Sequence, residues 1–495
     1  MKQMLSSVFK ISGISLVVIS FAMLPPLLVC VGYGEMHAAA GFAHAIWIGL
    51  LVGMVLFLLF RTGTRVLRVR DGFLVLAVCW LTASVFGAFP YLFTDTIASP
   101  VDAFFESASG FSTTGVTVFE DVESLPHGIL FWRSMTSWLG ALGILVFAVA
   151  LIPSLGINGS DITLQEEPSG RIDLMSPKTR RVMFGLTLAV IILTVAAAGL
   201  LAAGGMGIFD AFIHSMGTVS TGGFSNYNSG LTHFIADNSG IYSGLYIKYV
   251  IVFFMIIFGT SFTLFYSAIR SGLRVFKYDT EYNLYWIIIL LASLLLFLSF
   301  SFSFEGTTAA EDISDGIFHA VSILTTTGYT TGNPLAWPAF SQMVLLMLMF
   351  IGSCSSSAGS GNKVVRFIVL SELLFFRLRT RLHTTVFKSV RLNGRDIPND
   401  TVSGITNHLF LYIVMVFVGA FVLSLENVNF MDCFTTSVSL LGNVGPVLID
   451  HGGSSACFAE LHWFTKGFMS LMMIAGRLEL YTILVLFTPR FWRAD

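Results

Sequence analysis

The chain has 495 residues, of which 55% are hydrophobic and only 11% are charged. Soluble globular domains carry about 25% charged residues, so this composition excludes a soluble protein and indicates one that crosses a membrane many times. The formal net charge is only -2, and we expect no nucleic-acid partner.

Apolar stretches long enough to cross a bilayer recur along the chain. A spanning helix needs roughly 20 mostly apolar residues. Ten such stretches lie at about 9–33, 42–60, 72–93, 130–155, 182–204, 244–269, 284–303, 341–370, 404–425 and 463–488. The eighth is interrupted by small residues. We therefore predict an all-α polytopic membrane protein with ten transmembrane helices.

The basic residues gather on one side of this arrangement. Of the 27 lysines and arginines, all but four lie in the two tails and in the loops 61–70, 171–181, 270–277 and 363–395. The four exceptions are Arg133, Lys248, Lys466 and Arg477. By the positive-inside rule both termini are cytoplasmic, which requires an even number of spans.

Most acidic residues fall on the opposite side, and many flank polar segments. Examples are Asp95, Asp102, Glu106, Glu120, Asp121 and Glu123. An acidic outer vestibule would concentrate cations. Acidic residues also fill loops from which basic ones are excluded, and the sequence leaves both explanations open.

Five cysteines stand at scattered positions: Cys30, Cys79, Cys354, Cys433 and Cys457. Their spacing predicts neither a disulfide framework nor a zinc site, while an outer bridge between Cys433 and Cys457 stays open. The N-terminal apolar run is too long for a signal peptide, and we interpret it as the first span.

A short polar segment occurs four times, each time between two apolar stretches. Written from a shared aspartate, the copies are DAFFESASGFSTTG (102–115), DAFIHSMGTVSTGG (210–223), DGIFHAVSILTTTG (315–328) and DCFTTSVSLLGNVG (432–445). Each copy has a glycine 13 residues after its aspartate. One such match would carry no weight, whereas four in the same hydropathy frame indicate internal repetition.

Each copy predicts a short helix followed by non-helical backbone. Aspartate is a favoured N-cap, and the next residues would form a helix of roughly 12 to 15 Å, about half a bilayer. Because both neighbouring spans meet the outer side, the helix must descend from outside and the threonine–glycine segment must climb back. The partial negative charge of the helix C-terminus then points to the membrane centre and stabilises a cation. We expect the aspartates to be caps rather than ion ligands.

Non-helical backbone at this depth is tolerated only where protein buries it or where it lines a water-filled path. Glycine allows positive φ and close approach, so four copies around one axis can replace an ion's hydration shell with carbonyl oxygens. The alternative is that these re-entrant loops only pack the protein. The predicted selectivity filter comprises Thr113, Thr114, Gly115 and Val116; Ser220, Thr221, Gly222 and Gly223; Thr326, Thr327, Gly328 and Tyr329; and Asn443, Val444 and Gly445.

These features resemble the Trk/Ktr/HKT superfamily of potassium transporters, and specifically its TrkH-type bacterial membrane subunit. The resemblance covers essentially the whole chain. It implies two extra N-terminal helices in residues 1–70 and four units of helix, pore helix, filter loop and helix around a central pore, at 71–181, 182–281, 282–402 and 403–495.

The segments STTGV, STGGF, TTTGYT and GNVGP look like the four filter sequences of that family, in which one glycine per filter accompanies K⁺ preference. The resemblance therefore implies that K⁺ is bound in the filter at Thr114, Gly115, Gly222, Gly223, Thr327, Gly328, Val444 and Gly445. Asn443 and Val444 depart from the threonine pattern, so the fourth filter segment is expected to be less regular.

The interrupted eighth stretch carries IGSCSSSAGSGNK at 351–363. Glycine and serine disfavour a helix interior by up to about 1 kcal/mol each, so we expect an irregular, mobile loop below the filter; glycine-rich helix packing is the alternative. The resemblance matches it to an intramembrane loop that obstructs the pore. The predicted gate comprises Gly352, Ser353, Ser355, Ser356, Ser357, Gly359, Gly361 and Arg477.

Arg477 lies about midway through the last predicted span. An intramembrane arginine is costly and by default functional. We predict that it borders the ion path, contacts the loop and forms an electrostatic barrier; a structural salt bridge is the alternative. Glu479 is not expected to pair with it, because residues two apart on a helix do not share a face. His214 and His319 are interpreted as packing or vestibule residues.

No nucleotide-binding loop or catalytic constellation is present in the sequence, so no enzyme activity is expected. We predict K⁺ uptake across a bacterial inner membrane, driven by the membrane potential. The resemblance adds a second copy of the chain (a homodimer) and a cytosolic ring of nucleotide-binding, TrkA-type regulatory subunits, beside membrane lipid. The loops 371–395 and 156–181 are docking surfaces or ordinary positive-inside anchors. The alternative function is a proton- or sodium-coupled cation symporter, for which Glu479 is the candidate carboxylate.

Overall fold

The computed structural model describes residues 2–61, 66–155, 171–173, 177–235, 242–303, 308–332, 337–382, 390–445 and 458–492. This part of the chain is mostly helical, because backbone in hydrocarbon must satisfy its own N–H and C=O groups. Two short antiparallel strand pairs are also present. They are β1 (Val66–Arg68) with β2 (Arg171–Asp173) and β3 (Arg391–Leu392) with β4 (Arg395–Asp396).

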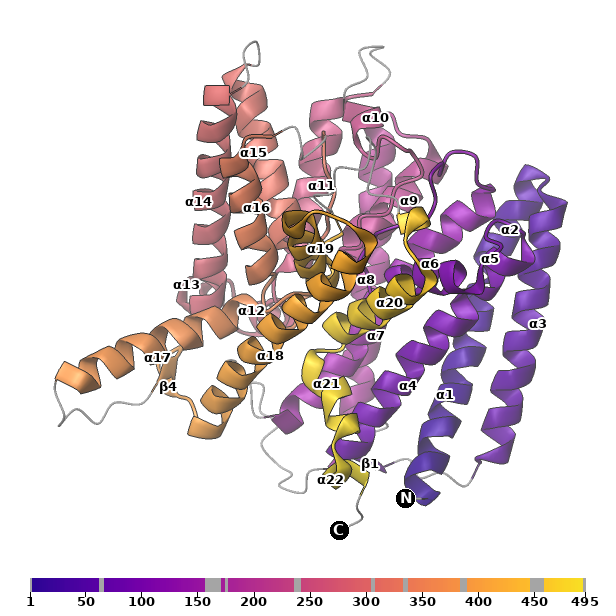
Figure 1. Ribbon diagram of the computed structural model, residues 1–495, viewed down its shortest axis with the longest axis horizontal. Coiled ribbons are helices and arrows are strands. Elements are labelled where there is room, and N and C mark those ends of the chain that lie inside the picture. The colour runs from indigo at the N-terminus through magenta and orange to yellow at the C-terminus, as the bar shows by residue number, and fades with distance from the viewer. Residues whose placement is uncertain are drawn as a thin grey trace.

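The three N-terminal helices pack together at one side of the molecule (Figure 1). They are α1 (Lys2–Ala22), its continuation α2 (Leu24–Tyr33), and α3 (Met36–Leu59). Glycines allow α1 and α3 to approach closely: a Cβ placed on Gly13 would lie 2.8 Å from the carbonyl oxygen of Gly53.

The remaining helices follow the four predicted units in chain order. The first unit holds α4 (Val69–Gly87), α5 (Phe89–Phe93), α6 (Pro100–Phe111) and α7 (His127–Leu155). The second holds α8 (Pro177–Ala203), α9 (Ile208–Val219), α10 (Thr232–Ile235), α11 (Gly244–Gly259), α12 (Phe262–Ser271) and α13 (Arg274–Tyr278). The third holds α14 (Thr280–Ser303), α15 (Ala309–Leu324), α16 (Ala339–Ile351) and α17 (Val364–Leu382). The fourth holds α18 (Asn399–Leu423), η2 (Ser424–Glu426), α19 (Phe430–Gly442), η3 (Phe458–Glu460), α20 (Trp463–Arg477), α21 (Leu480–Leu484), η4 (Val485–Phe487) and α22 (Pro489–Trp492).

Many of these helices are built to cross a membrane. Six segments of the described chain are long and apolar enough: Met4–Tyr33, Met36–Leu59, Asp71–Phe93, Met183–Ala203, Thr280–Phe302 and Asn399–Glu426. Two bent helix pairs raise the number to eight. The helices α7 and α16 occupy the other two predicted stretches. The chain is a membrane protein of helical class, and the total of ten spans stays a prediction.

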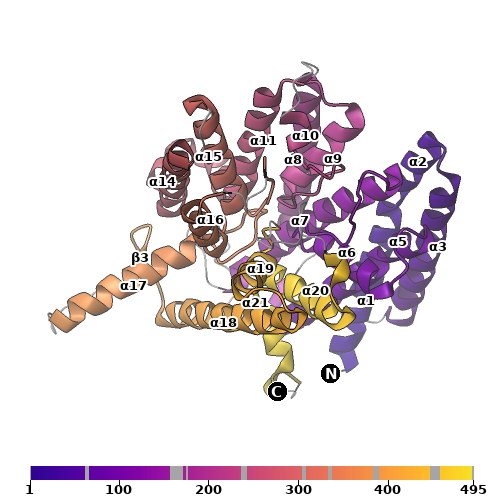
Figure 2. The same ribbon diagram turned by 45° about the horizontal axis from the view of Figure 1, so that its top comes forward.

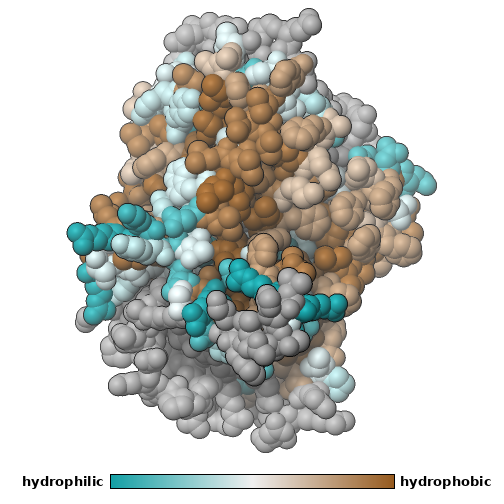
Figure 3. Space-filling view, turned by 90° about the vertical axis from the view of Figure 1, so that its left-hand side faces the viewer, coloured by the Kyte–Doolittle hydropathy of each residue, from teal (hydrophilic) through white to brown (hydrophobic). Residues whose placement is uncertain are grey.

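The outward face of α14 is apolar and suited to contact with lipid. Ile287, Leu290, Leu294 and Phe302 are each more than half exposed, and Figure 3 shows a broad apolar surface on this side of the molecule. A soluble protein rarely exposes so large an apolar patch, whereas lipid tails cover it without loss.

Two predicted spans are not continuous helices. Helices α11 and α12 meet at 85°, and α20 meets the segment α21–η4 at 115°. The expectation of uninterrupted spans at 244–269 and 463–488 is therefore wrong. Thr260 has extended backbone at the first break and Glu479 has φ of 59° at the second, and neither geometry fits an α-helix. The helix α7 of the first unit has no such break.

The helices assigned to the four predicted units lie around the middle of the molecule (Figure 2). Neighbouring units pack in chain order: α7 against α9, α11 against α15, and α16 against α19. Helix α20 of the last unit then packs against α6 of the first. The chain thus closes on itself, and α1 begins and α22 ends at the same end of the molecule (Figure 1).

Candidate ion pathway

The short helices α6, α9, α15 and α19 carry the four repeated segments, and their N-caps are not the shared aspartates. The caps are Ser99, Gly207, Thr308 and Asn429. The expectation that the aspartates are caps is therefore wrong. Asp102, Asp210 and Asp432 instead lie in the first turn, where a negative charge still favours the positive helix end.

Ion pairs hold two of these helices against their neighbours. Three of the four basic residues that the sequence places apart from the cytoplasmic loops take part. The pairs are Arg133–Glu106 (Nε to Oε1, 2.7 Å), Lys466–Asp102 (Nζ to Oδ1, 2.7 Å) and Lys248–Asp315. A charge removed from water requires such a partner. Glu106 is fully buried, so its expected place in an acidic vestibule is wrong.

Exposed acids remain in the loop that follows the first predicted filter segment. Glu120, Asp121 and Glu123 are exposed. The side chain of Asn228, from the second unit, donates a hydrogen bond to Asp121 over 2.8 Å and so lowers the pKa of that carboxyl. Asp121 therefore keeps its negative charge to lower pH than a free aspartate.

One position in three units ties the short helix to the chain that leaves the filter. In the first unit, Glu106 Oε2 accepts hydrogen bonds of 3.0 Å from Thr117 Oγ1 and from Val118 N. His214 and His319 occupy the same offset from the aspartate. His214 Nε2 lies 3.1 Å from Ser225 Oγ, and His319 Nε2 accepts from Thr331 N over 3.2 Å. The histidines are thus hydrogen-bonded packing residues.

The backbone of the predicted filter follows one pattern in all four units. Thr113, Thr221, Thr326 and Asn443 have φ between 52° and 59°, and Gly115, Gly223, Gly328 and Gly445 have φ between 64° and 99°. The residue between each pair has no positive φ, so the sign of φ alternates. A threonine at positive φ is rare and strained, at roughly 1–3 kcal/mol. Asn443 shares the pattern. The fourth segment is expected to be less regular, but the sign of its φ angles alternates as in the other three.

The four segments meet one another at these glycines. A Cβ on Gly115 would overlap the carbonyl oxygen of Gly222, one on Gly223 would overlap that of Thr327, and one on Gly445 would overlap that of Thr114. Each contact joins a glycine to the carbonyl one residue earlier in a neighbouring unit. In three of the four pairs of neighbouring units, a side chain at the glycine position would therefore collide with a carbonyl of the next unit.

Side chains brace the inner part of the filter. The hydroxyls of Ser112 and Thr114 are 2.7 Å apart, and those of Thr325 and Thr327 are 2.8 Å apart. In the fourth unit, Asn443 Nδ2 donates to Thr114 Oγ1 and to the carbonyl of Met473, both over 2.9 Å. The asparagine therefore links the fourth unit to the first.

The predicted gate is the irregular segment 352–363 between α16 and α17, and it contacts the predicted filter of the third unit. Its Ser360 N donates to Thr326 Oγ1 over 2.8 Å. Ala358 N and Cys354 N donate to the carbonyls of Phe258 and Gly259, over 3.0 and 3.1 Å. These carbonyls are free because α11 ends at Gly259, so the break in the second unit supplies acceptors for the loop.

The other predicted gate residues line and fold this loop. Gly352, Ser356 and Gly361 have positive φ, and Gly361 packs against Gly352. Ser353 and Ser357 share a hydrogen bond of 2.8 Å. A Cβ on Gly359 would lie 2.7 Å from the carbonyl oxygen of Thr325, which leaves no room for a side chain beneath the filter.

Arg477 reaches the loop from the last residue of α20. Its Nη1 donates to the carbonyl of Ala358 over 2.9 Å and to Ser360 Oγ over 2.6 Å. Only 4% of the residue is exposed. Among the described residues, no hydrogen-bond partner meets its Nε or Nη2.

The sequence interpretation missed one carboxylate at the base of the loop. Glu281, in the first turn of α14, accepts hydrogen bonds from Ser355 N over 2.6 Å, from Ser355 Oγ over 2.5 Å and from Val365 N over 3.2 Å. It is buried. An acid just before an apolar run is an ordinary helix start, and only the fold brings this one to the loop.

Glu479 is paired rather than free. Its Oε2 lies 2.6 Å from Arg366 Nη2, and Arg366 Nη1 lies 2.8 Å from His408 Nε2. As predicted, Arg477 forms its hydrogen bonds with the loop and not with Glu479. Cys433 is buried without a disulfide in the described part, and Cys457 lies outside the described residues.

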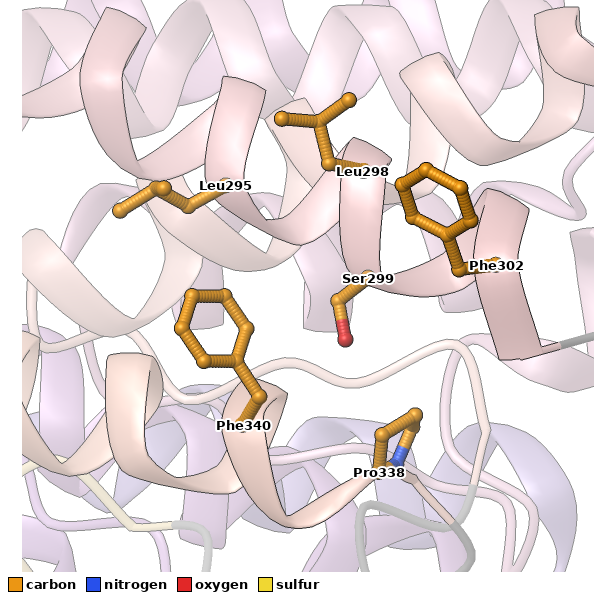
Figure 4. A pocket seen from close by; sticks show the side chains of 6 residues that line it. All are labelled: Leu295, Leu298, Ser299, Phe302, Pro338 and Phe340. Atoms are coloured by element: carbon orange, nitrogen blue, oxygen red, sulfur yellow. The ribbon is translucent and has the colours of Figure 1, made fainter.

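An apolar groove lies away from this path, between α14 and α16 (Figure 4). Its volume is about 310 Å³, and it is lined by Leu295, Leu298, Ser299, Phe302, Pro338 and Phe340. Ser299 Oγ already accepts a hydrogen bond from Ser341 Oγ over 2.8 Å. Among the described residues, the one polar side chain that lines the groove is therefore already hydrogen-bonded.

Known proteins of similar sequence are potassium uptake proteins. A family model described as TrkH, cation transport protein, matches residues 38–494. The Trk system potassium uptake protein TrkH of Escherichia coli (strain K12) is 32% identical over 494 residues, covering 98% of this chain and 99% of that protein. Its counterpart from Vibrio parahaemolyticus serotype O3:K6 is 32% identical over 493 residues, covering 99% of each.

The fold gives the same answer. The crystal structure of the potassium transporter TrkH from Vibrio parahaemolyticus matches with a TM-score of 0.88 and 31% identity, covering 99% of this chain and 100% of that one. The resemblance seen in the sequence is therefore confirmed, and the chain belongs to the TrkH family of cation transport proteins.

Proposed function

We propose that this chain is the membrane subunit of a bacterial potassium uptake system and passes K⁺ inward through a pore formed by the four repeated segments. The observation that carries the proposal is the alternating sign of φ in all four segments, together with the contacts of Gly115, Gly223 and Gly445 with neighbouring carbonyls. The similar proteins are named as potassium uptake proteins. No enzyme activity is proposed.

Carbonyl oxygens provide the chemistry of ion binding. Alternation of φ turns successive carbonyls toward the same side, so that several units can surround a K⁺ ion that has lost its water. The helices α6, α9, α15 and α19 end at the filter, and each contributes about -0.5 charge at its C-terminus. The carbonyls of Thr114, Gly222 and Thr327 face their neighbours, and with Val444 they form the proposed K⁺ site.

The segment 352–363 would act as the gate of this pore. It is hydrogen-bonded to Thr326 and lies against the Thr325 carbonyl, so the loop covers the inner end of the filter in this conformation. Arg477 adds a positive charge at the same level. Passage of K⁺ then requires the loop to move and the guanidinium to turn away or be screened by water.

A coupled symporter is the weaker candidate. Proton coupling usually requires an intramembrane carboxylate that can exchange its proton, and Glu479 is held by Arg366 over 2.6 Å. The buried Glu281 accepts hydrogen bonds from two groups of Ser355 in the loop and from Val365 N at the start of α17. Both carboxylates therefore have structural partners.

Transport measurements test the proposal. Expression in a bacterium that lacks its own K⁺ uptake systems should restore growth on low K⁺, and purified protein in vesicles should carry Rb⁺ down its gradient. Rb⁺ flux that is equal with and without a proton gradient supports the pore. Flux that follows the proton gradient, and loses this dependence in Glu479→Gln, would support symport instead.

We further propose that the subunit works as a homodimer in the bacterial inner membrane, with both termini cytoplasmic, and that cytosolic regulatory subunits bind its basic loops. The relatives are components of a Trk system. Helix α17 carries the basic residues Arg377, Arg379 and Arg381, while 156–170 and 383–389 lie outside the described residues. Light scattering of the purified protein measures the dimer, and accessibility of cysteines introduced near each end tests the topology.

A further inference from the structure

Two of the repeated segments hold the last carbonyl of the filter with a serine of their own helix. Ser109 Oγ donates to the carbonyl of Val116, and Ser322 Oγ donates to that of Tyr329, both over 2.6 Å. In each case the serine stands seven residues after the shared aspartate and the carbonyl seven residues further on. Both serines are fully buried. The bond therefore fixes the outer end of the filter to the end of the pore helix.

The second segment lacks this serine. Its equivalent position is Gly217, and the equivalent carbonyl belongs to Phe224. That carbonyl accepts a hydrogen bond of 3.0 Å from the Tyr329 hydroxyl of the third unit. Tyr329 is only 3% exposed. A donor from the neighbouring unit therefore occupies the role that serine has elsewhere.

Gly217 and Tyr329 also fit each other sterically. A Cβ on Gly217 would overlap the Tyr329 hydroxyl and would lie 3.1 Å from the Phe224 carbonyl oxygen. The tyrosine hydroxyl thus fills the space where a serine side chain would begin. Either residue can supply the donor, and both together cannot fit.

We propose that Tyr329 is a positioning residue that holds the Phe224 carbonyl in place of the missing serine, and that the Gly217–Tyr329 pair sets ion preference at the outer end of the filter. This inference rests on the proposed K⁺ pore. The Tyr329 hydroxyl joins the third unit to the second, while the Tyr329 carbonyl is held by Ser322 of its own unit. A loosened carbonyl there would close more easily around a smaller ion such as Na⁺.

The fourth unit has Ser439 at this place, and the carbonyl that it would meet lies outside the described residues. The comparison therefore rests on the first three units.

The first experiment removes the hydroxyl alone. The ratio of radioactive Rb⁺ to Na⁺ uptake is measured in vesicles for Tyr329→Phe, with the Rb⁺ flux of the unchanged protein as reference. We expect roughly a fivefold fall in the ratio, which corresponds to the loss of one neutral hydrogen bond. Ser109→Ala should lower the ratio to a similar extent. A Tyr329→Phe ratio equal to that of the unchanged protein would overturn the proposal.

The second experiment restores the donor from the other side. Gly217→Ser combined with Tyr329→Phe gives the second unit the serine that the first and third units carry, and we expect the Rb⁺/Na⁺ ratio to return to within about twofold of the unchanged protein. Gly217→Ala with Tyr329→Phe also adds a Cβ at position 217 but supplies no hydroxyl, and its Rb⁺/Na⁺ ratio should stay low. Equal ratios for the two double variants would show a purely steric role and contradict the proposal.

The two hypotheses fail differently. If the unchanged protein carries no Rb⁺ at all, the proposed pore is wrong. If it carries Rb⁺ selectively and Tyr329→Phe does not alter selectivity, only the present inference is wrong. Elution of each variant as a single species in detergent shows that it has folded.

Discussion

The Nη1 atom of Arg477 lies 2.9 Å from the carbonyl oxygen of Ala358, so the end of α20 is bonded to the loop that lies under the filter. The same carbonyl oxygen lies 3.4 Å from Thr221 Oγ1, a hydroxyl whose single proton has a closer acceptor in the Ser220 carbonyl at 2.6 Å. One loop carbonyl thus lies between a charged side chain of the fourth unit and a residue of the proposed filter in the second. A change at Arg477 therefore acts on the loop and on the electrostatics of the path together.

Replacing this arginine should make the pore easier to open. Arg477→Ala removes a positive charge and two hydrogen bonds. Hydrogen bonds from a charged group contribute about 1.5–3 kcal/mol each. We expect Rb⁺ flux into vesicles to rise at least about tenfold. Arg477→Lys keeps the charge without the planar fork and should give an intermediate rate. A variant with unchanged rate and selectivity would exclude the gating role.

The buried carboxylate at the base of the loop should stabilise the closed conformation. Glu281→Gln keeps the shape of the side chain. However, it replaces one acceptor oxygen with an NH₂ group, which is itself a donor and cannot accept the hydrogen bonds from Ser355. We expect Rb⁺ flux to rise roughly three- to tenfold, because hydrogen bonds to a carboxylate are lost. Glu372→Gln, at an exposed residue of α17, is the matched control. The idea fails if both variants give the flux of the unchanged protein.

The filter glycine of the first unit should control K⁺ preference. In Gly115→Ser, the new side chain would displace the Gly222 carbonyl, and the φ of 81° disfavours any L residue. We expect a fall in the Rb⁺/Na⁺ uptake ratio of about tenfold or more, as a carbonyl ligand moves out of position. Gly199→Ser makes the same substitution where no atom lies within 4 Å, and it should leave the ratio unchanged. Retained selectivity in Gly115→Ser would argue against the filter.

The Arg133–Glu106 pair should matter for stability. Removing one partner of a buried pair costs about 3–5 kcal/mol because the other charge stays buried alone, so Glu106→Gln should lower the thermal unfolding temperature in detergent. Glu106→Leu with Arg133→Met removes both charges and should recover only part of the loss, because Thr117 Oγ1 and Val118 N then lose their acceptor. Arg391→Met breaks the exposed Arg391–Asp396 pair, which is worth at most about 1 kcal/mol. Equal effects of Glu106→Gln and Arg391→Met would contradict this view.

The sequence by itself determined the helical membrane class, the family and the four repeated segments, which carry the proposed filter. These follow from local properties. Apolar runs must become helices in lipid, and a glycine at a fixed offset from an aspartate marks the same backbone turn four times. Residues near each other in the chain sufficed for that result. The breaks at Thr260 and Glu479 were not predicted, because each bent helix pair taken together still has the length and hydropathy of one span.

The tertiary structure alone decided which groups meet. The fold buries Glu106 against Arg133 although the sequence groups it with the acidic residues of the outer side, and it brings Glu281 to Ser355 of the loop, 74 residues away. It also places the Tyr329 hydroxyl where Gly217 lacks a side chain. Hydrogen bonds and ion pairs act over about 3 Å, so their partners are set by how the units close around the centre, which no single segment of the chain encodes.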